Sequence, residues 1–402
     1  MSALTISAGA PPRDRIEFVG LAALLGFVAA LQFSIAAADV LLTLMLVAWA
    51  VFLLVHRERP GVPAMFWPLV VYAGWTLVAT VFSRDPRVSI VDCKQLVLLL
   101  IVPAVYHLAR GPRAHTVLNV IITVAAASAI IGIVQYGVLH YDWLGRRPRG
   151  LLGHYMTYSG LLMLVACAAV ARLLFGRRDR IWPALVLPAL LVAISLTFTR
   201  NAWVGVCLGT ALLLVLKDFR LLAVLPVLAA LFIALAPSGV ISRVYSTFDR
   251  RDPASRDRIA MLEAGARIVR QYPLTGVGPD MVLRVYPEFR SADAVEPNQP
   301  HLHNVPLQIA AERGLPALVF WAWFIVALSI QLARKFRTDT YRVLPAAGLS
   351  AVAAMLAAGM FEYNFGDSEF LMLFLVLVTL PYAAARNGSR RKAKESRPPW
   401  MS

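Results

Sequence analysis

The sequence predicts an all-α protein that crosses a membrane about twelve times. Three observations support this fold class: 59% of the residues are hydrophobic, only 15% are charged, and the mean hydropathy is +0.67. A chain of this composition is suited to lipid as its main solvent. No soluble domain follows the last apolar run, so we expect a single integral membrane domain over residues 1–402.

Twelve apolar runs approach the length of about 20 residues that a helix needs to span a bilayer. They cover residues 18–36, 40–55, 63–82, 95–109, 115–138, 157–175, 181–199, 202–216, 221–237, 314–333, 343–363 and 370–385. Because this number is even, both termini are expected on the same side of the membrane.

The basic residues predict the orientation. When the connections are assigned alternately to the two sides, one side receives more than half of the 39 lysines and arginines, including Arg178 and those of the basic tail over 386–402. The positive-inside rule identifies this side as cytoplasmic. We expect the tail to be disordered and near the anionic inner leaflet. Membrane lipids, and no nucleic acid, are the partners expected from this distribution.

The remaining cations are more numerous than an ordinary outer face requires. They gather at Arg84, Arg87 and Lys94, at Arg146, Arg147 and Arg149, at Arg200, at nine arginines from Arg243 to Arg290, and at Arg313. Such an excess indicates an anionic ligand on the outer side. Contact with lipid phosphates is an equal alternative for the first two clusters, whereas the ligand is favoured for Arg200 and the long loop.

The long polar segment 238–302 lies between the ninth and tenth runs and is predicted to be periplasmic. Within 255–271, an apolar stripe recurs at helical spacing, formed by Ile259, Leu262, Ala266 and Val269. This pattern predicts an amphipathic helix at the membrane interface. Arg258 lies on the flank of the stripe and is expected to face the membrane cavity, in preference to Arg256.

His303 follows this loop at the start of the next predicted helix. Asn304 is a suitable N-cap, and Pro306 is tolerated in a first turn. Gly314 and Pro316 should then separate this short helix from the following span. His303 is therefore expected at the mouth of the bundle. An exposed turn histidine is the alternative, and the nearby arginines make it less favoured.

A lone histidine among arginines favours one type of chemistry. The chain has no Gly-x-Ser-x-Gly elbow, His-Glu-x-x-His motif, P-loop or Gly-x-Gly-x-x-Gly fingerprint. Glycosyl transfer from a lipid diphosphate fits better. Arginines bind the departing diphosphate through bidentate hydrogen bonds, and histidine is a base near neutral pH. A transporter would more often place charged or broken segments at mid-membrane.

Four short segments resemble the O-antigen ligases of the Wzy/WaaL superfamily. These are His303-Asn304 followed after nine residues by Gly314, the Thr199–Trp203 start of a span, Ser255–Ile259 and Gly276–Pro279. Thr199 stands where that family usually has Ser. The resemblance implies a membrane glycosyltransferase fold of the GT-C type and an active site facing the periplasm from the bacterial inner membrane.

The resemblance also implies a reaction and roles for residues. The reaction is an inverting transfer of O-antigen glycan from undecaprenyl diphosphate to the lipid A core, with no cofactor. His303 would be the catalytic base, and Arg200 and Arg258 would bind the donor diphosphate. His301, Asn304, Glu362 and Arg147 are supporting candidates. An O-antigen polymerase is the alternative within the superfamily, and a lipid-linked sugar transporter is the alternative outside it.

Metal dependence rests on the acidic residues near the last span. Asp367 and Glu369 resemble a pair that holds Mg²⁺ on a diphosphate, but a polar turn is favoured, so no metal is expected. Glu362 lies within an apolar run, where a carboxylate is costly unless it is paired. We therefore expect Glu362 to orient an arginine or His303.

Overall fold

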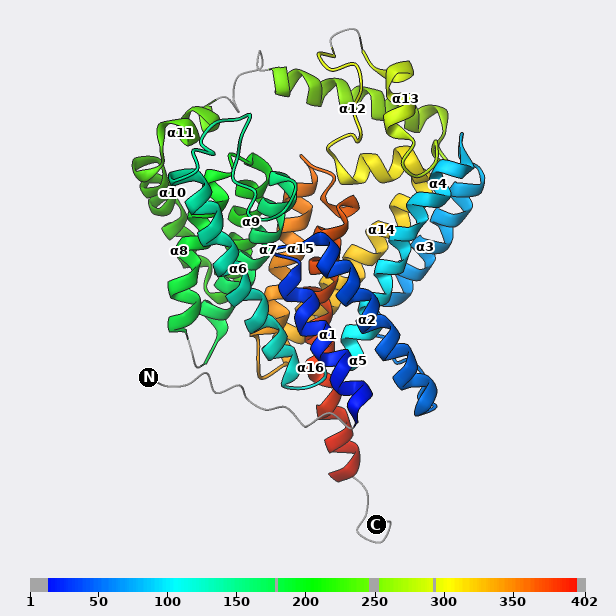
Figure 1. The fold of residues 1–402 in the computed structure, drawn as a ribbon, viewed down its shortest axis with the longest axis vertical. Helices are drawn as coiled ribbons and strands as arrows, with labels where there is room; N and C mark the ends of the chain where they lie inside the picture. Colours follow the sequence, from blue (N-terminus) through cyan, green and yellow to red (C-terminus); the bar gives the residue numbers. More distant parts are fainter. Residues whose placement is uncertain (1–13, 178–179, 246–252, 292–293, 396–402) are drawn as a thin grey trace.

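The computed structural model describes residues 14–177, 180–245, 253–291 and 294–395. Regular structure in these residues is helical, apart from one isolated bridge between Trp143 and Arg146. The helices form a bundle, and α12 and α13 lie across one end of it (Figure 1). We call this the outer end. Five of the cations counted in the charge distribution lie outside the described residues, namely Arg13, Arg178, Arg250, Arg251 and Arg397.

Each of the twelve predicted runs contains a helix. The bundle helices are α1 (Arg15–Ala30), α2 (Ile35–Val55), α3 (Phe66–Val81), α4 (Pro86–Asp92) continuing through η1 (Cys93–Leu100) into α5 (Ile101–Leu108), α6 (Arg113–Gly137), α7 (Tyr155–Phe175), α8 (Ile181–Leu196), α9 (Arg200–Lys217), η2 (Phe219–Ala223) with α10 (Val224–Leu235), α14 (Val305–Thr338), α15 (Val343–Gly359) and α16 (Ser368–Glu395). Among the described residues, seven helical segments are long and apolar enough to cross a membrane. The protein is therefore a polytopic helical protein, whereas the number of twelve spans remains a prediction.

Helix α7 is at the centre of the bundle, and most of its residues are buried. It packs against α8, α9 and α15. Gly205 and Gly209 allow α9 to approach its neighbours closely: a Cβ atom at either glycine would lie 3.1 Å from a backbone oxygen of α15 and still closer to a side chain of α7. Small residues at this spacing are typical of membrane helix contacts. This packing holds the first residues of α9 beside the last turn of α15.

The segment after α10 forms three more helices, α11 (Ser238–Tyr245), α12 (Pro253–Gln271) and α13 (Val282–Phe289). Ile259 and Leu262 of the predicted apolar stripe are exposed, whereas Met261, Ala264 and Ile268 are buried against α13 and the outer part of α14. The contact of the stripe with the membrane interface stays a prediction. Helix α12 has apolar residues on two sides, and periodicity alone could not tell which side contacts protein.

Two pairs of opposite charges fasten the outer ends of α3 and α4 to α13. Arg84 lies 2.7 Å from Glu288, and Arg284 lies 3.1 Å from Asp85. Arg84 thus pairs with a protein carboxylate. This contact supports neither of the two roles expected for it, binding of a lipid phosphate or binding of an anionic substrate. Arg267 of α12 donates to the carbonyl oxygens of Phe289 and Arg290. Part of the outer arginine excess therefore has a structural use.

At the opposite end, α16 differs from the expectation. It continues as a helix to Glu395, so the expected disorder of the basic tail 386–402 is wrong for residues 386–395. Residues 396–402 lie outside the described part of the chain. The end of α16 and the outer helices α12 and α13 lie at opposite ends of the molecule (Figure 1). This placement agrees with the predicted orientation, which itself stays a prediction.

Candidate active site

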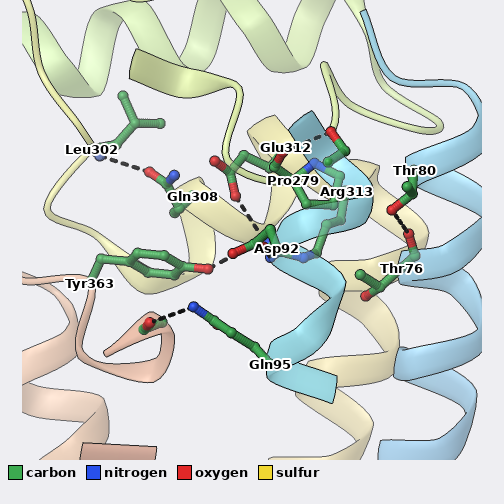
Figure 2. Close-up of polar contacts among 12 residues, drawn as sticks. Thr76, Thr80, Asp92, Gln95, Pro279, Leu302, Gln308, Glu312, Arg313 and Tyr363 are labelled. Atoms are coloured by element: carbon green, nitrogen blue, oxygen red, sulfur yellow. Dashed lines mark hydrogen bonds and ion pairs between the residues drawn. The ribbon is translucent and has the colours of Figure 1, made fainter. Parts of the chain in front are cut away.

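The loop before α14 holds His303 in a fixed position. Asn304 is the N-cap of α14, and its Oδ1 accepts a hydrogen bond of 2.9 Å from the Leu307 N–H, as expected. The Gln308 side chain accepts from the Leu302 N–H at 2.7 Å (Figure 2). His303 itself has φ of +49°, a left-handed conformation that is uncommon for residues other than glycine. Such conformations persist where the surrounding contacts impose them.

The helix that follows His303 ends at a kink, as predicted. Gly314 has φ of +80°, and a Cβ atom there would lie 1.8 Å from the Leu274 carbonyl oxygen. The turn at Gly276–Pro279 caps this helix end, because the N–H groups of Val277 and Gly278 each donate at 2.9 Å to carbonyl oxygens of Ala311 and Glu312. The Gly-x-Gly turn is therefore a structural support for the short helix that carries His303.

Glu362 lies beside His303. The predicted span 343–363 ends earlier, because α15 ends at Gly359 and Glu362 follows in a buried turn. Its Oε2 lies 2.9 Å from His303 Nδ1, and its Oε1 lies 3.6 Å from His301 Nε2. Asn304 Nδ2 donates to the Met360 carbonyl oxygen at 3.2 Å, which joins the two loops. Of the two partners expected for Glu362, the structure shows the histidine.

The hydrogen bond to Glu362 decides which imidazole nitrogen of His303 can act as a base. Burial raises the pKa of Glu362, but the hydrogen bonds from His303 and from the Tyr363 N–H and the interaction with the two imidazoles lower it, so the pKa lies below its ordinary value. An ionised carboxylate only accepts hydrogen bonds, so Nδ1 of His303 must carry the hydrogen. Nε2 is then left with its lone pair, as a general base requires.

His301 is packed against the same pair. Its ring lies 4.1 Å from the His303 ring, centroid to centroid. Burial lowers the pKa of His301 to about 4, so this imidazole is neutral at physiological pH. His301, His303 and Glu362 offer three ligand atoms within 4.8 Å of one another, a spacing that a metal ion could also use. The sequence did not indicate this cluster as a metal site.

A cavity of about 210 Å³ adjoins His301 and Glu362. Its walls come from the outer ends of α7, α9, α15 and α16 and from the turn between the last two. Asn201 and Ala202, which directly follow Arg200, form one side. Arg200 is the first residue of α9 and is buried. The structure thus places the beginning of α9, His301 and Glu362, the partner of His303, on one cavity.

Arg147, a supporting candidate from the sequence, lies close to Arg200. Burial lowers the pKa of Arg147, and the charge of Arg200 lowers it further, so the two guanidinium groups are near enough to repel each other. The Arg147 guanidinium also stacks 4.2 Å above the Tyr155 ring. Two cations held together in this way form a local positive field suited to an anion.

Arg258 and Arg256 lie on opposite faces of α12. Gly265 faces Leu302 and Leu307, next to His303. Arg258 precedes Gly265 by seven residues, about two helical turns, so it shares that face, whereas nine residues place Arg256 opposite. Arg258 is half-buried and Arg256 is exposed. This geometry favours Arg258 as the cation that faces His303. Asp257, between them, anchors the loop after α13 by accepting from the N–H groups of Val295 and Glu296.

Residues 185–322 match the family described as O-Antigen ligase. Over these residues the chain is similar to the O-antigen ligase family. This match covers about a third of the chain and includes Arg200, Arg258 and His303, whereas Glu362 and most of the cavity lie beyond it. No curated protein matches the chain. The similarity to this family supports a membrane-bound glycosyltransferase of lipopolysaccharide biosynthesis, of the ligase or polymerase type.

A buried ionic network around Arg313 lies at the other end of the short helix that begins after His303. Its contacts were not predicted from the sequence. Arg313 donates to Glu312 at 2.7 Å, to Asp92 at 3.0 Å and to the Tyr363 hydroxyl at 3.2 Å (Figure 2). The Tyr363 N–H in turn donates to Glu362 Oε1 at 3.0 Å. The network therefore connects α4 and α14 to the turn that holds Glu362. Adjacent charges at the start of a span, as at Glu312-Arg313, were the available signal.

Removal of Arg313 is expected to destabilise the protein strongly. Arg313→Met leaves the carboxylates of Asp92 and Glu312 without their shared cation, and breaking a buried pair in this way costs about 3–5 kcal/mol. The control is Arg84→Met, which removes an outer pair with half-exposed partners worth at most about 1 kcal/mol. Thermal unfolding of the purified variants in detergent measures both. Equal melting temperatures for the two variants would show that the Arg313 network does not stabilise the fold.

Proposed function

We propose that the protein is an O-antigen ligase. It would transfer O-antigen glycan from undecaprenyl diphosphate to a sugar of the lipid A core, at the periplasmic face of the bacterial inner membrane and with a fold of the GT-C type. The observation that carries this proposal is the hydrogen bond between His303 Nδ1 and the buried Glu362 carboxylate. A histidine oriented by a carboxylate is a suitable base for an acceptor hydroxyl.

The proposed step is a single displacement. Nε2 of His303 takes the proton of the acceptor hydroxyl as the oxygen attacks the anomeric carbon of the donor glycan. The bond between this carbon and the diphosphate oxygen breaks, and its electron pair leaves with the diphosphate, so the anomeric configuration inverts. Glu362 stabilises the imidazolium that forms, because its negative charge lies 2.9 Å from Nδ1.

Arg200 and Arg258 would bind the diphosphate. The leaving group gains negative charge as the bond breaks, and guanidinium groups stabilise this charge through bidentate hydrogen bonds in a site partly closed to water. Arg200 precedes Asn201 and Ala202 of the cavity wall at the start of α9, and Arg258 shares the face of α12 whose Gly265 lies against Leu302 and Leu307. Arg147 adds charge beside Arg200 in a supporting role.

A reconstituted reaction distinguishes the proposed ligase from two other functions. An O-antigen polymerase would use the same donor and a similar site, and a transporter would catalyse no transfer. Purified protein in liposomes is supplied with labelled undecaprenyl-diphosphate glycan and lipid A core, and the products are separated by size and hydrophobicity. We expect a labelled glycolipid that contains lipid A. A longer lipid-linked donor would identify a polymerase, and unchanged substrates would reject both enzymes.

The reaction is expected to proceed without a divalent metal. Asp367, one member of the acidic pair considered for Mg²⁺, has both carboxylate oxygens in use: Oδ1 accepts from the Phe370 N–H at the start of α16, and Oδ2 accepts from the Thr157 hydroxyl. We therefore expect the initial rate of transfer in excess EDTA to equal the rate without it. Loss of activity in EDTA that is restored by Mg²⁺ or Zn²⁺ would contradict this. The His301, His303 and Glu362 cluster would then be the first candidate ligand set.

A further inference from the structure

The cavity beside Glu362 has a lining suited to a neutral, polyhydroxylated ligand. Its polar wall is formed by His154, Thr157, Asn201, His301, Asn364 and Asp367, in addition to Glu362. Neither lysine nor arginine is among the residues that line it. A diphosphate would meet two carboxylates here and no cation, so the diphosphate must lie elsewhere, toward the arginines.

Two buried atoms in this lining have no hydrogen-bond partner among the described residues. They are Nδ1 of His301 and Oδ1 of Asn364. Asn364 uses its Nδ2 to donate to the Met355 carbonyl oxygen at 3.1 Å, so its Oδ1 is an acceptor. Nδ1 of the neutral His301 imidazole can accept as well, in the tautomer whose Nε2–H faces the Glu362 carboxylate 3.6 Å away. Buried acceptors without a donor are costly, and a ligand with several donors would satisfy them.

The size of the cavity limits the ligand further. The cavity measures about 210 Å³. This is the scale of one six-membered sugar ring, and it is too small for an oligosaccharide or a prenyl chain. The Phe370 ring and the aliphatic side chains of Met156 and Met163 add apolar wall for the C–H faces of such a ring.

We propose that this cavity binds a single neutral pyranose ring, and that this ring is the terminal sugar of the acceptor. The assignment to the acceptor rests on the proposed function. The base must contact the acceptor hydroxyl, and Glu362, the partner of His303, is part of the cavity wall. Asn364 and His301 then select among acceptor sugars by the positions of their hydroxyl groups, which makes them specificity-determining residues.

Two substitutions fill the cavity without removing any proposed catalytic group. Ala358→Leu adds bulk from the α15 wall, and Met156→Trp adds it from a half-buried position on α7 that tolerates a larger side chain more easily. Leu151→Trp is the matched control, because Leu151 is exposed, lies near Met156 in the chain and does not line the cavity. Elution on size-exclusion chromatography identifies any variant that fails to fold.

The first measurement is binding without turnover. Saturation-transfer NMR follows methyl glucoside, methyl galactoside and a methyl heptoside with the protein in a detergent that has no sugar headgroup. We expect at least one of them to bind the unchanged protein and Leu151→Trp, and none to bind folded Ala358→Leu or Met156→Trp. Binding that survives in both filled variants, or displacement by inorganic phosphate, would overturn the proposal. This result does not depend on whether the protein is a ligase.

The second measurement identifies the source of the ring. In the transfer assay, filling the cavity should raise the KM for lipid A core by about tenfold or more and leave the KM for the lipid-linked donor within about twofold. A rise confined to the donor KM would overturn the assignment to the acceptor. If the protein shows no transfer to lipid A core while the methyl glycoside binds as expected, the proposed function fails and the pyranose site stands.

Discussion

Replacing His303 with alanine should abolish glycan transfer and leave donor binding nearly unchanged. General-base catalysis contributes about 10²–10⁴-fold to a rate, so kcat should fall by this factor. The base acts on the attacking oxygen, whereas the diphosphate is bound by arginines, so the affinity for donor should be conserved. A binding titration with labelled donor and a transfer assay on the same preparation measure the two quantities.

Two further variants separate the base from a merely structural role of His303. Asparagine tolerates the left-handed conformation of residue 303 better than alanine does, and it can still donate to Glu362, but it cannot take a proton. His303→Asn should therefore be as inactive as His303→Ala while its melting temperature stays close to that of the unchanged protein. His301→Ala should reduce transfer less. Near-normal turnover in His303→Ala, or a defect due only to lost donor affinity, would contradict the role of base.

The pH dependence provides a second readout of the same residue. A base must be neutral, so the transfer rate should fall once the medium is acidic enough to protonate His303. His301 is not expected to cause this fall, because burial lowers its pKa to about 4 and it remains neutral above that pH. The acid limb should therefore persist in His301→Ala. If the fall in rate at low pH disappeared in His301→Ala, it would arise from His301 and not from His303, which would contradict this account.

Loss of Arg200 or Arg258 is expected to have the second large effect. Each guanidinium stabilises charge that develops on the leaving diphosphate, and removal of one such donor costs about 2–4 kcal/mol of transition-state stabilisation. Arg200→Ala and Arg258→Ala should therefore lower kcat by roughly 30- to 1000-fold. Lysine should restore little, because a point charge lacks the two-pronged geometry of guanidinium.

Arg256 is the matched control for Arg258. The two residues belong to the same helix, but Arg256 lies on the opposite, exposed face. Arg256→Lys should keep at least about half of the activity, whereas Arg258→Lys should not. Equal losses at both positions would indicate a general electrostatic effect of α12. A larger loss at Arg256 would reverse the assignment of the diphosphate ligand.

Local features of the fold could be predicted from the sequence because they depend on residues close together in the chain. The Asn304 cap and the kink at Gly314 are set by side chains and turn conformations within a few residues, and both predictions are confirmed. The apolar runs are likewise local, and each contains a helix. The face of α12 that packs against protein could not be predicted, because its partners, α13 and the outer part of α14, lie 11 or more residues away from its end.

The side-chain contacts of the site could not be predicted because they join distant parts of the chain. His303 and Glu362 are 59 residues apart, and Arg313 and Asp92 are 221 residues apart. The sequence showed that Glu362 needs a partner, since a carboxylate in an apolar run is costly. Which partner it has depends on how α15 ends against the start of α14. The cavity, formed by four helix ends, had no counterpart in any local pattern.

The most direct test of the central claim is the stoichiometry of a reconstituted reaction. Undecaprenyl diphosphate and glycan-bearing lipid A are quantified together over time, with and without lipid A core and with His303→Asn as the inactive control. We expect one prenyl diphosphate for each glycolipid, no release without the acceptor, and neither product from His303→Asn. Release of prenyl diphosphate without acceptor, or glycolipid formed by His303→Asn at the normal rate, would contradict base-catalysed transfer at this site.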